Sequence, residues 1–228
     1  IYICCSTHDT NENLKKIIET GYPEVITLQY NLLDRRLEES IALAHERGIG
    51  IVVMGPVGGG RLGCSSEVFE KLVPGIDRVP ELALRFVLSN PNVCTALSGM
   101  SKMEHVEENL KIALKAKPLT EEEKTIVDEH TAKLKKMAEL YCTGCDYCMP
   151  CPNGVAISQI FERYNRGRVY GLWENAREEY SYIGKGKKGR NNDLKKADAC
   201  VSCGLCEEKC PQNIPIRKYL AEAHKMLS

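Results

Sequence analysis

The sequence has no long hydrophobic run, no excess of either charge and no targeting segment. Its 228 residues include 31 basic and 31 acidic side chains, and no apolar stretch approaches the roughly 20 residues that span a bilayer. Balanced charge leaves no basic surface for nucleic acid or an anionic membrane, so we expect neither as a partner. Without a targeting segment we expect a cytoplasmic protein. The chain also lacks an initiator methionine and starts at Ile1 inside an apparent strand, so we interpret it as a piece without its N-terminal portion.

Cysteine, in contrast, is abundant, and eight of the twelve cysteines fall in two runs near the C-terminus. The first run reads C-x2-C-x2-C-x2-C-P, and the second reads C-x2-C-x2-C-x3-C-P, which is the spacing of a bacterial ferredoxin half-site. The runs are Cys142, Cys145, Cys148 and Cys151, and Cys200, Cys203, Cys206 and Cys210. Two such runs predict two 4Fe-4S clusters.

The two runs are expected to share their ligands. A 4Fe-4S cluster takes four thiolates, and in two-cluster ferredoxins the fourth comes from the other run. The predicted ligand sets are Cys142, Cys145, Cys148 and Cys210 for one cluster, and Cys200, Cys203, Cys206 and Cys151 for the other. Gly144 and Gly204 lie between cysteines, where the backbone must turn tightly. Such shared ligation predicts that the region loses its fold without the clusters.

Two other interpretations of the cysteine runs stay open. Structural zinc favours two cysteine pairs separated by a spacer rather than four cysteines in a row. Disulfides favour short secreted chains, which this one does not resemble. The remaining cysteines lie in or beside apolar runs and are expected to be buried thiols; they are Cys4, Cys5, Cys64 and Cys94.

Residues 1–116 alternate short apolar segments with segments of helical periodicity. Strands are predicted at 1–6, 25–28, 49–54 and 93–97, and helices at 9–20, 35–47, 80–88 and 103–114. The segment 49–54 is so apolar that we expect it to be buried on both faces, and Val106, Leu110 and Ile112 are expected to face a core. This alternation predicts parallel βαβ units, and four of them make about half of a TIM barrel.

A long helix is predicted to link this region to the cysteine runs. Residues 117–141 contain Thr120 and Glu123, which form a T-x-x-E capping box. Residues 142–228 then form the predicted iron–sulfur domain, with helices around 157–164, 172–180 and 215–227. The predicted fold is therefore an α/β partial barrel followed by a mainly α, ferredoxin-like domain.

Four segments of the first region resemble the C-terminal half of an aldo/keto reductase. They are VITLQYNLLD (25–34), GIVVMGPVGGGRLG (50–63), PELALRFVLSNPNVCTALSGM (80–100) and MEHVEENL (103–110). The cysteine region resembles the ferredoxin-like extension found in one branch of that family. The resemblance implies that residues 1–116 supply barrel strands five to eight, and that NAD(P)H binds at the C-terminal ends of these strands.

The same resemblance implies a set of nucleotide contacts. Ser6 and Thr7 match the strand end that hydrogen-bonds the nicotinamide carboxamide, Thr27 lies where family members often carry Gln, and Met54 stands where many stack an aromatic ring. The implied contacts with the phosphates and the adenosine are Pro56, Gly58, Gly60, Ser98, Gly99, Met100, Ser101, Glu108 and Asn109.

The resemblance implies an iron–sulfur oxidoreductase of the aldo/keto reductase type, with an unknown small-molecule substrate. The family's catalytic Asp, Tyr, Lys and His come from the first four strands, so we identify no catalytic residue here and expect this chain alone to lack carbonyl reductase activity. Nicotinamide delivers two electrons and a cluster accepts one, so a ferredoxin or flavoprotein is a candidate redox partner. Structural clusters and a different barrel cofactor stay open, as does a ferredoxin-like electron-transfer module on a catalytically idle barrel.

Overall fold

The computed structural model describes residues 2–115, 117–139, 142, 144–185 and 193–228. The chain divides into two compact units. The first unit comprises Ile1–Cys64 and Phe69–Thr131, and the second comprises Ser65–Val68 and Ala132–Ser228. This division falls inside the helix predicted as the linker, and the domain bounds at 116 and 141 stay a prediction. Within the described residues, no helix is both long and apolar enough to cross a membrane.

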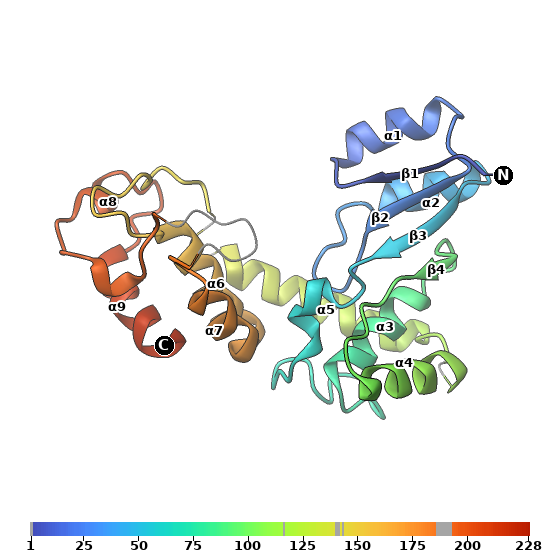
Figure 1. Cartoon of the computed structure of the whole chain (residues 1–228). Helices are drawn as coiled ribbons and strands as arrows, with labels where there is room; N and C mark the ends of the chain where they lie inside the picture. The colour runs from blue at the N-terminus through green and yellow to red at the C-terminus, as the bar shows by residue number, and fades with distance from the viewer. Residues whose placement is uncertain (1, 116, 140–141, 143, 186–192) are drawn as a thin grey trace. The chain divides into compact units, whose positions relative to one another are not determined.

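The first unit contains a four-stranded parallel sheet in the order β1-β2-β3-β4 (Figure 1). Its strands are β1 (Cys4–Thr7), β2 (Val25–Gln29), β3 (Gly50–Met54) and β4 (Thr95–Ala96). In the register, Ser6 pairs with Thr27, and Gln29 pairs with Met54. Each strand lies beside the one before it in the chain, which confirms the predicted parallel βαβ units.

Helices connect the strands of this sheet. They are α1 (Asn11–Glu19), α2 (Glu38–Glu46), the 3-10 helix η1 (Gly58–Gly63), α3 (Val79–Leu88) and α4 (Met103–Lys115). The side chain of Thr10 caps α1 by accepting a hydrogen bond from the backbone N–H of Asn13 at 3.3 Å. Pro80 lies in the first turn of α3, where its missing N–H costs nothing.

The sheet buries one face fully. Ile26, Leu28, Ile51 and Val53 are completely buried, together with one apolar stripe of α1 and one of α2. The alternate residues of β3 are only half-buried. The prediction that residues 49–54 are buried on both faces is therefore wrong, because in the described part of the chain the helices cover a single face.

Two further expectations about burial are also wrong. Val106 and Leu110 of α4 are 39% and 55% exposed, although their spacing predicted core positions. Cys4 and Cys94 are exposed rather than buried thiols. The cause is the same in each case: the segments are apolar, but no described element packs over these side chains.

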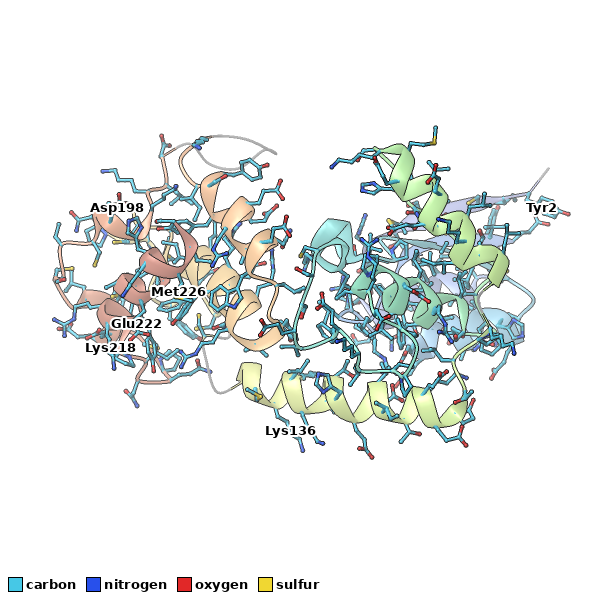
Figure 2. The ribbon with its side chains drawn as sticks, turned by 90° about the horizontal axis from the view of Figure 1, so that it is seen from below. Tyr2, Lys136, Asp198, Lys218, Glu222 and Met226 are labelled. Carbon is cyan, nitrogen blue, oxygen red and sulfur yellow. The ribbon has the colours of Figure 1, made fainter. Side chains whose placement is uncertain are left out.

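The helix α5 (Glu121–Glu139) follows the first unit's last strand and helix (Figure 2). Its predicted capping box is confirmed: the Thr120 N–H donates to Glu123 Oε2 at 2.8 Å, and the Glu123 N–H donates to Thr120 Oγ1 at 3.2 Å. Residues 140–141 of the predicted linker lie outside the described residues. Lys136 marks the C-terminal part of the helix in Figure 2.

The second unit is mainly helical. Its elements are α6 (Ile157–Tyr170), α7 (Trp173–Ser181), the 3-10 helix η3 (Ala197–Ala199), α8 (Leu205–Glu208) and α9 (Ile216–Leu227). Figure 2 shows Lys218, Glu222 and Met226 along α9. Ile160, Phe161, Tyr180, Leu220 and Ala223 form the centre of a core between α6, α7 and α9, and cysteines of both runs pack against that core.

Gly167 is required by the packing of α6 against α7. A Cβ built on Gly167 would overlap three ring carbons of Trp173, and the Tyr164 ring lies 6.2 Å from the Trp173 ring. Alanine would gain about 1 kcal/mol of helix propensity, but overpacking of this kind costs about 1–3 kcal/mol. We therefore expect Gly167→Ala to lower the melting temperature by several degrees, measured by circular dichroism on anaerobic protein.

Gly63→Ala is the control for this substitution, because a Cβ at Gly63 meets no heavy atom within 4 Å. We expect its stability to change by less than about 0.5 kcal/mol. Equal melting temperatures for the two variants would show that Trp173 does not restrict position 167.

Candidate iron–sulfur centre

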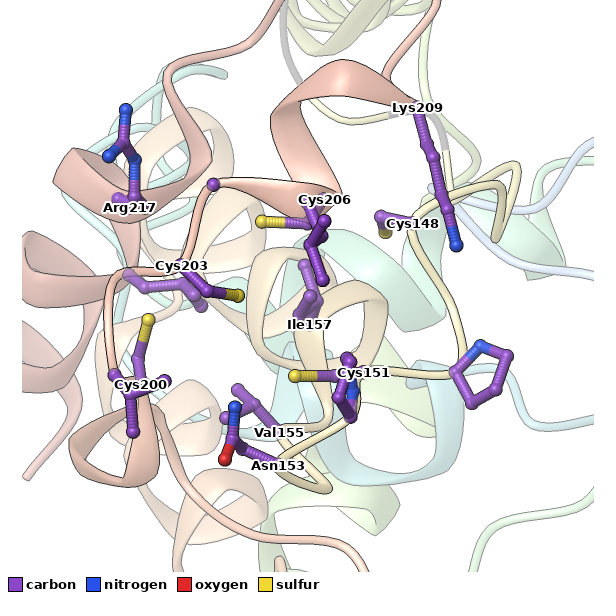
Figure 3. Close-up of a pocket in the computed structure, with 16 residues that line it drawn as sticks. Cys148, Cys151, Asn153, Val155, Ile157, Cys200, Cys203, Cys206, Lys209 and Arg217 are labelled. Atoms are coloured by element: carbon purple, nitrogen blue, oxygen red, sulfur yellow. The ribbon is translucent and has the colours of Figure 1, made fainter.

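Four thiols surround one cavity of the second unit (Figure 3). Cys200 follows η3, Cys203 lies in the next loop, Cys206 lies in α8, and Cys151 comes from the first cysteine run. In Figure 3 their sulfur atoms point toward a common centre, whereas Cys148 lies to one side. The cavity has a volume of about 430 Å³, including space open to solvent, and Val155, Ile157 and Leu220 form part of its apolar wall.

The other four thiols of the two runs surround a second cavity. Cys142, Cys145 and Cys148 line it together with Cys210 from the second run. This cavity has a volume of about 350 Å³, again including open space, and its wall includes Phe161, Ile214 and Ile216. The structure therefore brings together, around each cavity, the four cysteines that the sequence assigned to one cluster.

Tight turns place the successive cysteines of each run. Gly144 and Gly204 have φ angles of +73° and +85°, as expected for glycines between ligands. Asp146 and Ser202 also adopt positive φ, at 63° and 57°, where side chains other than glycine are uncommon. These left-handed residues curl both runs so that the thiols converge.

The thiols are crowded and partly withdrawn from water. Burial and, in smaller part, the neighbouring Cys142, Cys206 and Cys145 raise the pKa of the Cys148 thiol to about 11. The pKa of Cys142 is raised by burial and, in part, by Cys145 and Cys210. Charge contacts thus cross between the runs. A bound cationic centre would offset this repulsion and stabilise the thiolates.

The donor set fits a cluster better than it fits the other two interpretations. The eight cysteines of the two runs have free thiols, which contradicts a disulfide framework. Among the residues that the structure describes, no three Cys, His, Asp or Glu side chains are placed to hold a single metal ion. Four thiols spread around a cavity match a cluster that presents four irons at alternate corners, whereas one zinc ion needs its ligands within about 2.3 Å.

The residues expected to contact nicotinamide lie on the half-buried face of the sheet or beside it. Ser6 and Thr27 are register partners on β1 and β2, and Met54 ends β3. Gln29, on the same face as Thr27, donates a hydrogen bond to Asp34 Oδ2 at 3.0 Å. Thr7 Oγ1 accepts a hydrogen bond from the Asp9 N–H at 3.0 Å, so that hydroxyl helps to shape the loop after β1.

The residues expected to contact the phosphates and the adenosine lie in two groups. Pro56, Gly58 and Gly60 belong to the loop and short helix after β3, and both glycines have positive φ. The second group consists of two residues of α4, Glu108 and Asn109, and of the segment before that helix, Ser98, Gly99, Met100 and Ser101. There Asn109 Nδ2 donates to Ser98 Oγ at 2.9 Å, and Glu108 forms an ion pair with Arg78. The assignment of these residues to nucleotide contacts stays a prediction.

Sequence reasoning missed the charged groups beside the two cavities. Asp146 lines the Cys142 cavity, and Lys209 and Arg217 line the Cys200 cavity. Asp146 and Lys209 adjoin cysteines in the sequence, which is a signal that could have drawn attention to them. Arg217 lies on α9, and no ligand-spacing rule predicts its position.

Both parts of the chain match known protein families. Residues 65–132 match the aldo/keto reductase family, and residues 141–215 match the 4Fe-4S dicluster domain. The uncharacterized oxidoreductase YqkF of Bacillus subtilis (strain 168) is 31% identical over an alignment of 142 residues, and the match covers 52% of this chain and 46% of the relative. The uncharacterized oxidoreductase C215.11c of Schizosaccharomyces pombe is 30% identical over 95 residues, which are 40% of this chain and 31% of the relative. The chain thus spans less than half the length of these curated relatives.

Two similar solved structures are aldo-keto reductases. The holo form of AKR11C1 from Bacillus halodurans is 29% identical, with 57% of this chain and 49% of that chain covered and a TM-score of 0.48. The thermostable Tm1743, solved with the inhibitor epalrestat, is 24% identical, with 57% and 48% covered and a TM-score of 0.45. On the sequence matches, residues 65–132 are similar to the aldo/keto reductase family, and residues 141–215 are similar to the 4Fe-4S dicluster domain.

Proposed function

We propose that this chain is part of an iron–sulfur oxidoreductase of the aldo/keto reductase type, acting on a small molecule that is still to be identified. In this proposal the first unit supplies strands five to eight of a β/α barrel, and the second unit binds two 4Fe-4S clusters. The observation that carries it is the grouping of eight thiols around two cavities: each cavity is lined by the four cysteines of one predicted ligand set, and Cys148 lines both.

The proposed ligand sets cross between the two cysteine runs. Cys142, Cys145 and Cys148 would bind one cluster with Cys210, and Cys200, Cys203 and Cys206 would bind the other with Cys151. Apolar residues of α6 and α9 line part of both cavities, while Cys145 and Cys203 stay exposed to solvent. When bound, such clusters supply one-electron transfer.

The proposed nicotinamide site lies at the C-terminal ends of the strands, where barrel enzymes place their active sites. Ser6, Thr27 and Gln29 offer polar side chains there, and the glycine-rich loop after β3 is the proposed phosphate contact, although the N–H groups of Gly58 and Gly60 donate to the carbonyl oxygens of Gly55 and Val57. NAD(P)H is therefore the proposed second cofactor. Because a hydride carries two electrons and a cluster takes one, we also propose a ferredoxin or a flavoprotein as redox partner. The proposed compartment is the cytoplasm.

Metal analysis tests the cluster part of this proposal. Protein purified without air is expected to be brown and to contain about eight iron atoms and eight acid-labile sulfides per chain, as two 4Fe-4S clusters require. Colourless protein that contains zinc and no iron would overturn the proposal.

Nucleotide binding tests the barrel part. In the full-length protein, we expect Ser6→Ala to weaken NAD(P)H binding about fivefold. This loss corresponds to one net hydrogen bond of about 1 kcal/mol. The titration follows nicotinamide fluorescence. Ser181→Ala, at the end of α7 in the second unit, serves as the control. If the parent protein binds neither NADH nor NADPH, the proposed nicotinamide site is wrong. Equal nucleotide affinities of the Ser6→Ala and Ser181→Ala variants would show that Ser6 does not contact the nucleotide.

A further inference from the structure

An ion pair holds a guanidinium beside one of the two cavities. Arg217 Nε donates to Glu207 Oε2 at 3.0 Å, and Arg217 Nη2 lies 2.8 Å from the same oxygen. The backbone N–H of Arg217 donates to Glu207 Oε1 at 2.8 Å. These contacts join the first turn of α9 to α8, so the guanidinium has a defined position rather than that of a free surface side chain.

The same guanidinium lies against the loop that carries three of the thiols. Arg217 Nη1 donates a long hydrogen bond of 3.5 Å to the carbonyl oxygen of Ser202. A Cβ built on Gly204 would lie 3.9 Å from Arg217 Cζ. The pKa of Arg217 is raised, first by Glu207 and in addition by the thiolates of Cys206 and Cys200. Arg217 is therefore in electrostatic contact with the Cys200 cavity.

The two cavities differ in the charge around them. Lys209 and Arg217 line the Cys200 cavity, and Glu207 adds one negative charge that is paired with Arg217. Asp146 is the charged residue among the described lining of the Cys142 cavity, where it also raises the pKa of Cys142. One cavity thus has a positive surrounding, and the other has a negative one.

This difference has a consequence for reduction. Adding an electron makes a thiolate-ligated cluster more negative, so a nearby cation stabilises the reduced state and a nearby anion destabilises it. We propose that Arg217 raises the reduction potential at the Cys151, Cys200, Cys203 and Cys206 site above that at the Cys142, Cys145, Cys148 and Cys210 site. An electron that enters the domain would then reside mainly on the cluster beside Arg217. The inference relies on the ligand sets proposed above.

The size of the effect is limited by solvent. The Arg217 side chain is 48% exposed, so water and salt screen its charge. We expect the substitution of Arg217 by Gln to change the one-electron equilibrium between the two sites about tenfold, which corresponds to about 59 mV.

The test is a redox titration of the cluster-loaded protein, followed by electron paramagnetic resonance. Arg217→Gln should lower one of the two midpoint potentials, and Glu207→Gln should raise that same midpoint because it removes the opposing charge. Arg217→Lys should restore a value close to that of the parent. Asp146→Asn should raise the other midpoint.

The opposite signs distinguish electrostatics from structural damage. Arg217→Gln and Glu207→Gln break the same ion pair, so a merely structural role would move the midpoint in one direction for both. Shifts of the same sign, or no shift in either variant, would overturn the inference while the clusters remain. A parent protein in which no cluster assembles would instead overturn the proposed function, and this inference with it.

Discussion

Replacing Cys210 by serine is expected to release iron from the three cysteines of the other run, and to leave its own run occupied. Cys210 lines the cavity of Cys142, Cys145 and Cys148, although it lies far from them in the sequence. Serine is a poor ligand for iron in place of a thiolate. Iron and sulfide content should therefore fall by about half.

Alkylation identifies which site is lost. After brief treatment of the Cys210→Ser variant with iodoacetamide, mass spectrometry should find Cys142, Cys145 and Cys148 modified, with Cys151, Cys200, Cys203 and Cys206 protected. Cys151→Ser is the matched control, and it should give the reverse pattern. If Cys210→Ser exposes Cys200, Cys203 and Cys206 instead, each run binds its own cluster and the crossed ligation is wrong.

Iron removal is expected to unfold the cysteine segments of the second unit. Residues 144–156 and 195–214 contain little regular structure: α8 has four residues, and Val155 pairs with Lys195 in an isolated bridge. Because structural metal sites contribute several kcal/mol to folding, hydrogen exchange in these segments should accelerate by about 100-fold or more after anaerobic chelation.

Other parts of the chain provide internal controls for that experiment. The fully buried Leu82 and Val87 of α3 belong to the first unit's core, and their amides should keep their protection. The core between α6, α7 and α9 should retain more protection than the cysteine segments, because Ile160, Tyr180 and Leu220 are buried among apolar side chains of three helices. Unchanged exchange in the cysteine segments would show that the clusters do not support the fold there.

Local patterns in the sequence were sufficient to predict most elements. The alternation of apolar strands with amphipathic segments predicted the parallel sheet, and Thr120 with Glu123 predicted the start of α5. Boundaries were less accurate: α2 begins at Glu38 rather than Arg35, and β4 shrinks to Thr95–Ala96. Strand and helix ends depend on tertiary contacts, which local periodicity does not encode.

Burial could not be predicted in the same way. Val106 and Leu110 have the spacing of a core-facing stripe, but whether such a stripe is covered depends on what packs there. The same holds for β3, whose apolar composition suggested two covered faces. Periodicity identifies an apolar face, and it does not identify the element that covers it.

The candidate site likewise contains residues that the sequence predicted and residues that it could not predict. Cysteine spacing predicted both groups of thiols, because the geometry of a cluster constrains its ligands directly. Arg217 could not be found in this way, since its place beside Cys200 and Cys206 depends on how α9 packs against α8 and on the pairing with Glu207. Charges that tune a site are positioned by packing rather than by a motif.

Anomalous diffraction at the iron absorption edge, from crystals of the loaded protein grown without air, tests the central claim most directly. We expect two iron-rich peaks, one surrounded by the sulfurs of Cys151, Cys200, Cys203 and Cys206, and the other by those of Cys142, Cys145, Cys148 and Cys210. A single peak, a signal at the zinc edge alone, or four ligands drawn from one run at each peak would contradict it.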